Sequence, residues 1–238
     1  AGPRVARIGY LGPSQGGWVA PLAAKAEPVD FVMVAFGLAV SALDEDREAI
    51  AINIDAAHGG PQAMAGAMEV ADACAALVLH PTLEVFDRFD RVRHHFAREP
   101  WLKKVRGDFC GALLGLERET LPQLTQQLSD DTPWLYDPMA TIAAVRAPQL
   151  WMLAEDDLDA PSAETAHRLA ALRLSGRPIA TAVFPHTEHG IYEYEAAADG
   201  SRASTRQPDG YLRLMVDFAR GVPLKPPYGT AALALPQE

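Results

Sequence analysis

The chain has 238 residues, of which 49% are hydrophobic and 22% charged, a composition typical of a globular protein with a sizeable core. Its formal net charge is −10, from 21 basic and 31 acidic residues. This balance argues against a nucleic-acid partner and against an anionic membrane surface. We judge the apolar stretches too short to span a bilayer, so no membrane insertion is expected.

The amino-terminal stretch predicts a strand, a tight turn and a helix. An apolar run over residues 5–11 predicts a buried strand, and residues 18–26 predict an amphipathic helix. Between them, residues 12–16 read GPSQG, a G-x-S-x-G pattern in the strand–turn–helix context that supports it. The pentapeptide alone equally fits a glycine-rich turn capped by a serine. The flanking strand and helix favour the other interpretation, in which Ser14 is a nucleophile with its Oγ exposed.

A continuous run of β-branched and aromatic residues at 31–36 predicts a second buried strand. Strand, helix and strand in succession form a βαβ unit, which indicates an α/β fold with a parallel sheet. No strand pattern follows until residue 131. Helices are predicted there over residues 41–57, 62–79, 82–98 and 116–128. We therefore predict a helical cap inserted over residues 41–131, and a core formed by residues 1–40 and 132–238.

The predicted core resumes with alternating helices and strands. Further strands are expected at residues 149–153 and 179–184, each followed by a polar loop. Helices are expected over residues 139–145, 162–174 and 210–220. Residues 196–207 are expected to be mobile, and the proline-rich tail from Val222 to be irregular.

Three loops that follow predicted parallel strands carry the parts of a Ser-His-Asp system. Such loops converge at one crevice, because the carboxyl ends of parallel strands lie at the same edge of the sheet. Ser14 is the candidate nucleophile, His189 the general base, and Asp157 the carboxylate that orients the imidazole. Asp156 and Asp159 remain alternatives for the carboxylate. His186 is an alternative for the base.

The same segments resemble a known family. The stretches ARIGYLGPSQGGW at residues 6–18, LAEDDLDAP at 153–161 and FPHTEHG at 184–190 resemble the elbow, acid loop and histidine loop of α/β-hydrolases. Within that family they resemble the esterase and acyl-peptidase-like branch with a helical cap. In that branch a small residue precedes the acid by three positions and a proline follows by four, which selects Asp157. The glycine after His189 selects that histidine.

The resemblance implies a serine hydrolase that cleaves carboxylic esters, or related acyl and amide bonds, through an acyl-enzyme. It implies that the backbone N–H of Gln15 binds the oxyanion. Pro13 departs from the histidine often found before the nucleophile. No metal and no organic cofactor are implied, and His58, His94 and His95 lack metal-site spacing.

The resemblance covers only the C-terminal portion of the family's fold. About four strands precede the elbow strand in α/β-hydrolases, and the second oxyanion donor comes from that portion. Here only a few residues precede the elbow. We therefore expect that a second polypeptide completes the sheet or that the chain derives from a longer precursor, since the first strand would otherwise expose an apolar edge. Alone, the chain is expected to be a poor enzyme.

Two other functions stay open. One is a non-catalytic or degenerate hydrolase subunit that acts as a binding or structural module. The other is an acyltransferase or aminopeptidase on the same scaffold. Trp18, Trp101 and Trp134 are candidates to line the site, although core packing is the favoured role. Cys74 and Cys110 are favoured as buried small hydrophobes, a disulfide being the alternative, and they do not fix the cellular compartment.

Overall fold

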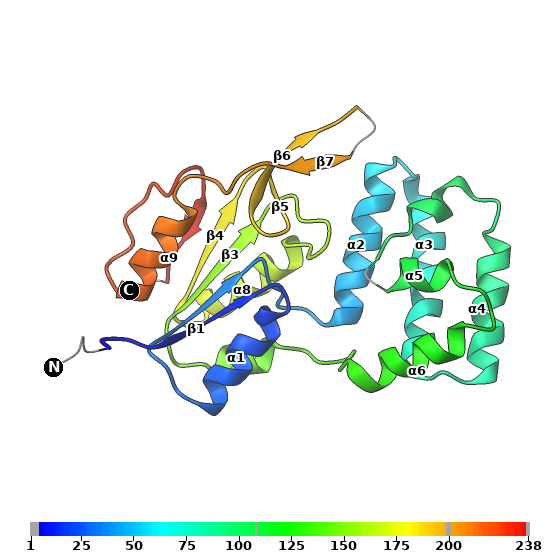
Figure 1. The fold of residues 1–238 in the computed structure, drawn as a ribbon, viewed down its shortest axis with the longest axis horizontal. Coiled ribbons are helices and arrows are strands. Elements are labelled where there is room, and N and C mark those ends of the chain that lie inside the picture. Colours follow the sequence, from blue (N-terminus) through cyan, green and yellow to red (C-terminus); the bar gives the residue numbers. More distant parts are fainter. Residues whose placement is uncertain (1–4, 108, 199–200, 237–238) are drawn as a thin grey trace. The chain divides into compact units, whose positions relative to one another are not determined.

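A computed structural model describes residues 5–107, 109–198 and 201–236. The chain divides into two compact units (Figure 1), Ala1–Val40 with Asp137–Glu238, and Ser41–Tyr136. The expected insertion ended at residue 131, whereas the second unit runs to Tyr136 because Trp134 packs into the core of the helical unit. The predicted role of that unit as a cap stays a prediction.

The first unit contains a five-stranded sheet in the order β1-β2-β3-β4-β8. The first four strands, β1 (Gly9–Pro13), β2 (Phe31–Ala35), β3 (Gln149–Ala154) and β4 (Ile179–Phe184), are parallel. This arrangement confirms the α/β class with a parallel sheet. The tail expected to be irregular adds an antiparallel edge strand, β8 (Ala232–Ala234), beside β4.

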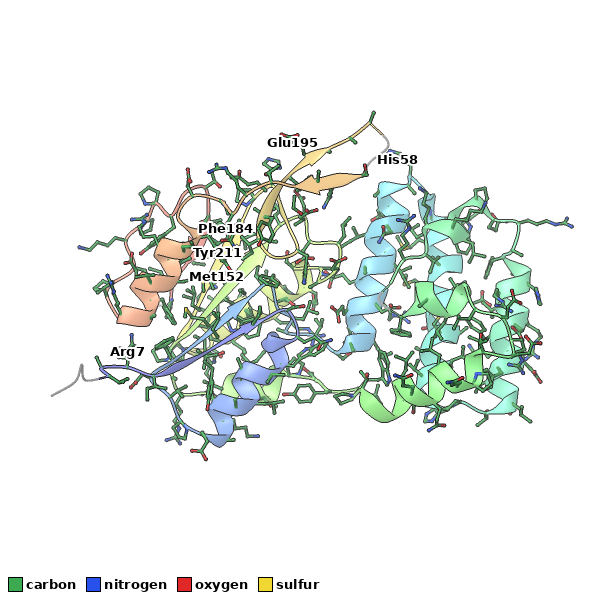
Figure 2. The ribbon with its side chains drawn as sticks, in the orientation of Figure 1. Arg7, His58, Met152, Phe184, Glu195 and Tyr211 are labelled. Atoms are coloured by element: carbon green, nitrogen blue, oxygen red, sulfur yellow. A yellow bond between two sulfur atoms is a disulfide. The ribbon has the colours of Figure 1, made fainter. Side chains whose placement is uncertain are left out.

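Helices cover both faces of this sheet (Figure 1). Residues of α1 (Gly16–Ala26), α7 (Met139–Ala144) and α8 (Ala163–Leu174) share one buried cluster with Val32, Val34 and Trp151. Neighbouring residues of a strand point to opposite faces of the sheet, because side chains alternate with a period of two. The strand side chains of the opposite face, Met152 and Phe184 among them, pack against α9 (Tyr211–Arg220). Figure 2 shows Met152, Phe184 and Tyr211 together there.

The first strand differs from its prediction as a buried strand over residues 5–11. It begins at Gly9, extends to Pro13, and pairs only with β2 among the described residues. Apolar side chains are left in solvent here: Leu11 of β1 is 49% exposed, and Ile8, just before the strand, is 61% exposed. All five residues of β2, by contrast, are buried.

A small three-stranded sheet is formed by β5 (Thr187–Glu188), β6 (Tyr192–Ala196) and β7 (Arg202–Ser204). Part of the segment expected to be mobile, residues 196–207, belongs to this sheet, because it contains the end of β6 and all of β7. Tyr194 fixes it to the first unit, because its hydroxyl donates to an Asp156 carboxylate oxygen at 2.9 Å. The Arg202 guanidinium lies 4.3 Å from the centre of the Tyr194 ring. These contacts explain why a polar segment is ordered here.

The second unit is entirely helical in its described part. It contains α2 (Ala42–Ala56), α3 (Gly60–Leu79), α4 (Leu83–His95), the 3₁₀ helix η1 (Pro100–Lys104), α5 (Cys110–Leu114) and α6 (Leu121–Asp131). Ser41 and Thr82 cap α2 and α4, each accepting a hydrogen bond from a backbone N–H with its side chain. The helix predicted over residues 116–128 forms as α6, but it begins at Leu121 rather than at residue 116, and Pro122 stands in its first turn.

Two further expectations for this unit are corrected. Cys74 and Cys110 form a disulfide, with their Cα atoms 5.4 Å apart, rather than packing as separate hydrophobes. The 20-residue helix α3 is long and apolar enough to cross a membrane, and no other such helix occurs in the described ranges. Half of its most apolar window is buried inside the protein, where it packs in the core of the helical unit.

The three candidate tryptophans pack in the two cores. Trp18 packs beside Leu38 and Val40 and donates from Nε1 to the Val40 carbonyl at 2.8 Å. Trp101 lies against Phe96, with ring centres 5.0 Å apart. Trp134 donates from Nε1 to the Leu128 carbonyl at 3.0 Å.

Candidate active site

Ser14 lies at the tip of the turn between β1 and α1, in a backbone conformation that non-glycine residues rarely adopt. Its φ is +50°, in the left-handed region. The turn is held by two backbone hydrogen bonds, from Ser14 N–H to the Ala35 carbonyl at 2.9 Å and from Gly17 N–H to the Ser14 carbonyl at 2.8 Å. A strained residue retained by its surroundings is a mark of a functional position.

Gly12 explains how strand and helix come so close at this turn. A Cβ atom at Gly12 would overlap the backbone of Gly16, in particular its carbonyl oxygen. Only glycine therefore fits at this position without displacing the start of α1. The G-x-S-x-G spacing thus has a steric cause, which is the packing of one backbone on another.

Gln15, the predicted oxyanion donor, is the residue that precedes the first turn of α1. Its backbone N–H finds no acceptor among the residues that the structure describes. The amino end of a helix carries unsatisfied N–H groups and a positive partial charge, and both favour an anion. An oxyanion bound there would accept a hydrogen bond from a donor that is already in place.

Asp157 and His189 are in direct contact. The Nδ1 atom of His189 lies 3.0 Å and 3.2 Å from the two carboxylate oxygens of Asp157, whose side chain is 1% exposed. Asp157 comes from the loop after β3, and His189 directly follows the short strand β5, which comes after β4. β3 and β4 are neighbours in the sheet. The backbone N–H groups of Asp159 and Ala160 also donate to Asp157, at 3.0 Å and 2.8 Å. The carboxylate is therefore fixed before it meets the imidazole.

The alternatives lie elsewhere in the same loops. Asp159 is exposed, and Asp156 points to Tyr194. The side chain of His186 is 90% exposed, and its Nδ1 lies 3.8 Å from an oxygen of Asp156. Burial and the hydrogen bond to Asp156 both raise the pKa of Tyr194, so this phenol stays a donor to Asp156.

Phe36, which the sequence analysis did not select, connects the serine turn with the histidine. It follows β2 directly and has a φ of +43°. Its ring packs edge-on against the imidazole of His189, with ring centres 4.9 Å apart. The preceding residue, Ala35, accepts the hydrogen bond from Ser14 N–H. A left-handed backbone at the end of a buried strand leaves no pattern in the sequence, so this contact appears only in the fold.

A cavity of about 380 Å³ opens beside His189. Its lining includes Asp159, Glu188, Arg202 and Ser204. Arg202 is anchored by a hydrogen bond from Nη1 to the backbone carbonyl of Asp156 at 2.6 Å. Arg202 and Ser204 come from the β6–β7 hairpin and were not predicted. The alternation of tyrosine and glutamate at residues 192–195 is the signal that indicates this hairpin.

No protein-family model matches the chain, and no curated protein matches its sequence. Several solved structures resemble it, and they are members of the α/β-hydrolase superfamily. One is an acylaminoacyl peptidase from Pyrococcus horikoshii, with 16% identity over 77% of this chain and a TM-score of 0.37. Another is a proline iminopeptidase from Mycobacterium smegmatis, with 18% identity over 78% of this chain and a TM-score of 0.38. A third is an esterase from Thermogutta terrifontis, with 14% identity over 77% and a TM-score of 0.34.

This chain spans only part of each of these proteins. It covers 20% of the P. horikoshii peptidase, 59% of the M. smegmatis iminopeptidase and 58% of the T. terrifontis esterase.

Proposed function

We propose that this chain carries the catalytic residues of a serine hydrolase of the α/β-hydrolase type, which acts on carboxylic esters or related acyl and amide bonds. The observation that carries the proposal is the contact between the buried Asp157 carboxylate and Nδ1 of His189. A buried carboxylate on one nitrogen of an imidazole fixes the tautomer and stabilises the imidazolium ion. The strained Ser14 follows β1 at the same end of the parallel strands.

In the proposed reaction Ser14 Oγ attacks the carbonyl carbon of the substrate. Because Nδ1 of His189 faces Asp157, Nε2 is the nitrogen that takes the serine proton. The proton then passes from Nε2 to the leaving alcohol or amine as the C–O or C–N bond breaks. This step leaves an acyl group on Ser14 and His189 neutral again.

Water completes the cycle on the same residues. His189 takes a proton from the water as its oxygen attacks the acyl carbon, and Ser14 leaves with that proton. In both steps the carbonyl oxygen becomes an oxyanion, for which the N–H of Gln15 is the proposed donor. The amino end of α1 adds a favourable electrostatic contribution.

The cavity beside His189 favours substrates with a polar group near the reacting carbonyl. Charged or hydroxyl side chains, Asp159, Glu188, Arg202 and Ser204, form most of its lining. A long hydrocarbon chain would desolvate these groups without pairing them, at a cost in free energy. We therefore place short or polar acyl compounds ahead of long-chain lipids as substrates.

We further propose that a second polypeptide adds a strand to the edge of β1 that no described strand covers. Unpaired strand edges with exposed apolar side chains invite pairing with another chain, and Ile8 and Leu11 are exposed beside this edge. Val19 of the neighbouring helix α1 is 61% exposed as well. Native mass spectrometry of the purified protein tests this proposal. It predicts a heteromeric complex, and a chain that stays alone at micromolar concentration would contradict it.

The hydrolase proposal is tested by assaying the protein, as purified with any bound partner, on p-nitrophenyl acetate and butyrate. Ser14→Ala is expected to lower kcat by roughly a thousand-fold or more, because no nucleophile remains. The control is Ser175→Ala, which changes an exposed serine at the end of α8 and should retain full activity. Equal activity of Ser14→Ala and wild type would refute the proposal.

A further inference from the structure

A second cavity lies within the helical unit and is unrelated to the serine turn. Its volume is about 460 Å³, within the usual range of small-molecule sites. It is bounded by η1, the segment after it, α5 and one side chain of α4. Its lining includes three basic side chains and, besides Ala112, three large apolar ones: Arg93, Lys103, Arg106, Leu102, Val105 and Leu114.

The charge of this pocket is opposite to that of the protein. The whole chain carries a net charge of −10, yet every charged residue that lines the pocket is basic. Arg93 is already paired, since it donates to Asp90 at 2.9 Å and to the Leu116 carbonyl at 2.6 Å. Lys103 and Arg106 have no ion-pair partner within the described ranges. No carboxylate of the described residues therefore neutralises these two positive charges.

The start of α5, beside the pocket, is held by buried contacts. Asp46 is buried, and its Oδ1 accepts from the backbone N–H groups of Phe109 and Cys110 at 3.0 Å and 3.3 Å. The disulfide to Cys74 fixes the start of α5 to α3. Because Asp46 already occupies these amides, the attraction for an anion comes from the basic side chains rather than from the end of the short helix.

The apolar side of the lining defines the rest of the ligand. Leu102, Val105 and Leu114 provide a surface on which hydrocarbon can be buried. We propose that this pocket binds a small amphipathic anion, a carboxylate or phosphate monoester attached to a short apolar group. Lys103 and Arg106 bind the oxyanion, and the three apolar side chains bind the hydrocarbon.

The test is isothermal titration of the full protein with sodium octanoate and, separately, with octyl phosphate. Two control ligands separate the two parts. Octanol has the apolar chain without the charge, and inorganic phosphate has the charge without the apolar chain. We expect at least one of the two amphipathic anions to bind at least ten-fold more tightly than either of these. The two anions distinguish a carboxylate ligand from a phosphate ligand. Affinity should fall as salt is raised, because the charge interaction is screened.

The double variant Lys103→Gln/Arg106→Gln is expected to weaken anion binding at least ten-fold. Both side chains are exposed, so the fold should persist, which the thermal unfolding curve checks. Lys104→Gln is the matched control, since Lys104 is exposed in the same 3₁₀ helix and does not line the pocket. The proposal would be overturned if neither anion binds, or if neither binds more tightly than octanol. It would also be overturned if the anions bind the double variant as tightly as wild type. This readout is independent of Ser14 and of hydrolysis.

Discussion

Asp156 and Asp157 are adjacent in the chain, yet only one of them contacts the histidine. Asp157 is buried against His189, whereas Asp156 is half-buried and accepts from the hydroxyl of Tyr194. Both residues lie in the turn after β3, where the two neighbouring carboxylates have different partners. The role proposed for Asp157 is therefore testable against its neighbour.

We predict that Asp157→Asn lowers kcat by about ten thousand-fold while KM changes little, since an amide neither fixes the productive tautomer nor stabilises the imidazolium. The fold should persist, because the amide oxygen can still accept from Asp159 and Ala160. Ester hydrolysis at neutral pH measures the effect.

Asp156→Asn is the control, because an asparagine there can still accept from Tyr194. Its kcat should stay within a few-fold of wild type. If Asp156→Asn loses as much activity as Asp157→Asn, or if Asp157→Asn stays active, the assignment of the carboxylate is wrong.

At the residue scale, motif spacing selected Asp157 and His189, and these two side chains are in contact in the structure. Phe36 and Arg202 were missed. Phe36 contacts His189 because its own backbone turns into the left-handed conformation after β2. Arg202 lines the cavity beside His189 because the β6–β7 hairpin carries it there. Both depend on long-range packing, which a motif in one loop does not contain.

At the scale of elements, β2, β3 and β4 were predicted almost to the residue. Each is a continuous apolar run, which is the pattern of a strand buried on both faces. The short elements β7, β8 and α5 were missed, because five residues or fewer carry too little periodicity. Their formation depends on partners elsewhere, such as β4 for β8.

The serine turn allows a prediction for the element pair β1 and α1. Gly12→Ala should destabilise the first unit by about 1–3 kcal/mol, because the new methyl group overlaps the backbone of Gly16. Gly16→Ala should cost clearly less, since its methyl group would meet only Pro13 Cδ, at 3.3 Å. Urea unfolding curves measure both values, and equal costs would contradict this account of the turn.

At the scale of the whole molecule, stability at high pH should depend on Tyr211. Burial raises the pKa of Tyr211 from 10.0 to about 12, so the unfolded chain loses this proton before the folded protein does. Its contribution to stability is therefore complete below pH 10 and is lost as pH rises towards 12. The pKa values of Tyr194 and Tyr228 are raised too, so they add to the same loss.

We predict that the free energy of unfolding of wild type falls between pH 10 and pH 12, and that it falls less steeply in Tyr211→Phe. The variant keeps the ring, which packs edge-on against Phe184. Urea unfolding at several pH values gives both slopes. Identical slopes for the two proteins would show that Tyr211 does not titrate as described.

The central claim is that Ser14 is a nucleophile activated by the Asp157–His189 pair. The most direct measurement is labelling of the native protein with a serine-reactive fluorophosphonate, followed by mass spectrometry of the peptides. The account predicts one adduct, on Ser14, which is absent from Ser14→Ala and much slower to form in His189→Ala. A protein that stays unlabelled, or an adduct on another serine, would contradict it.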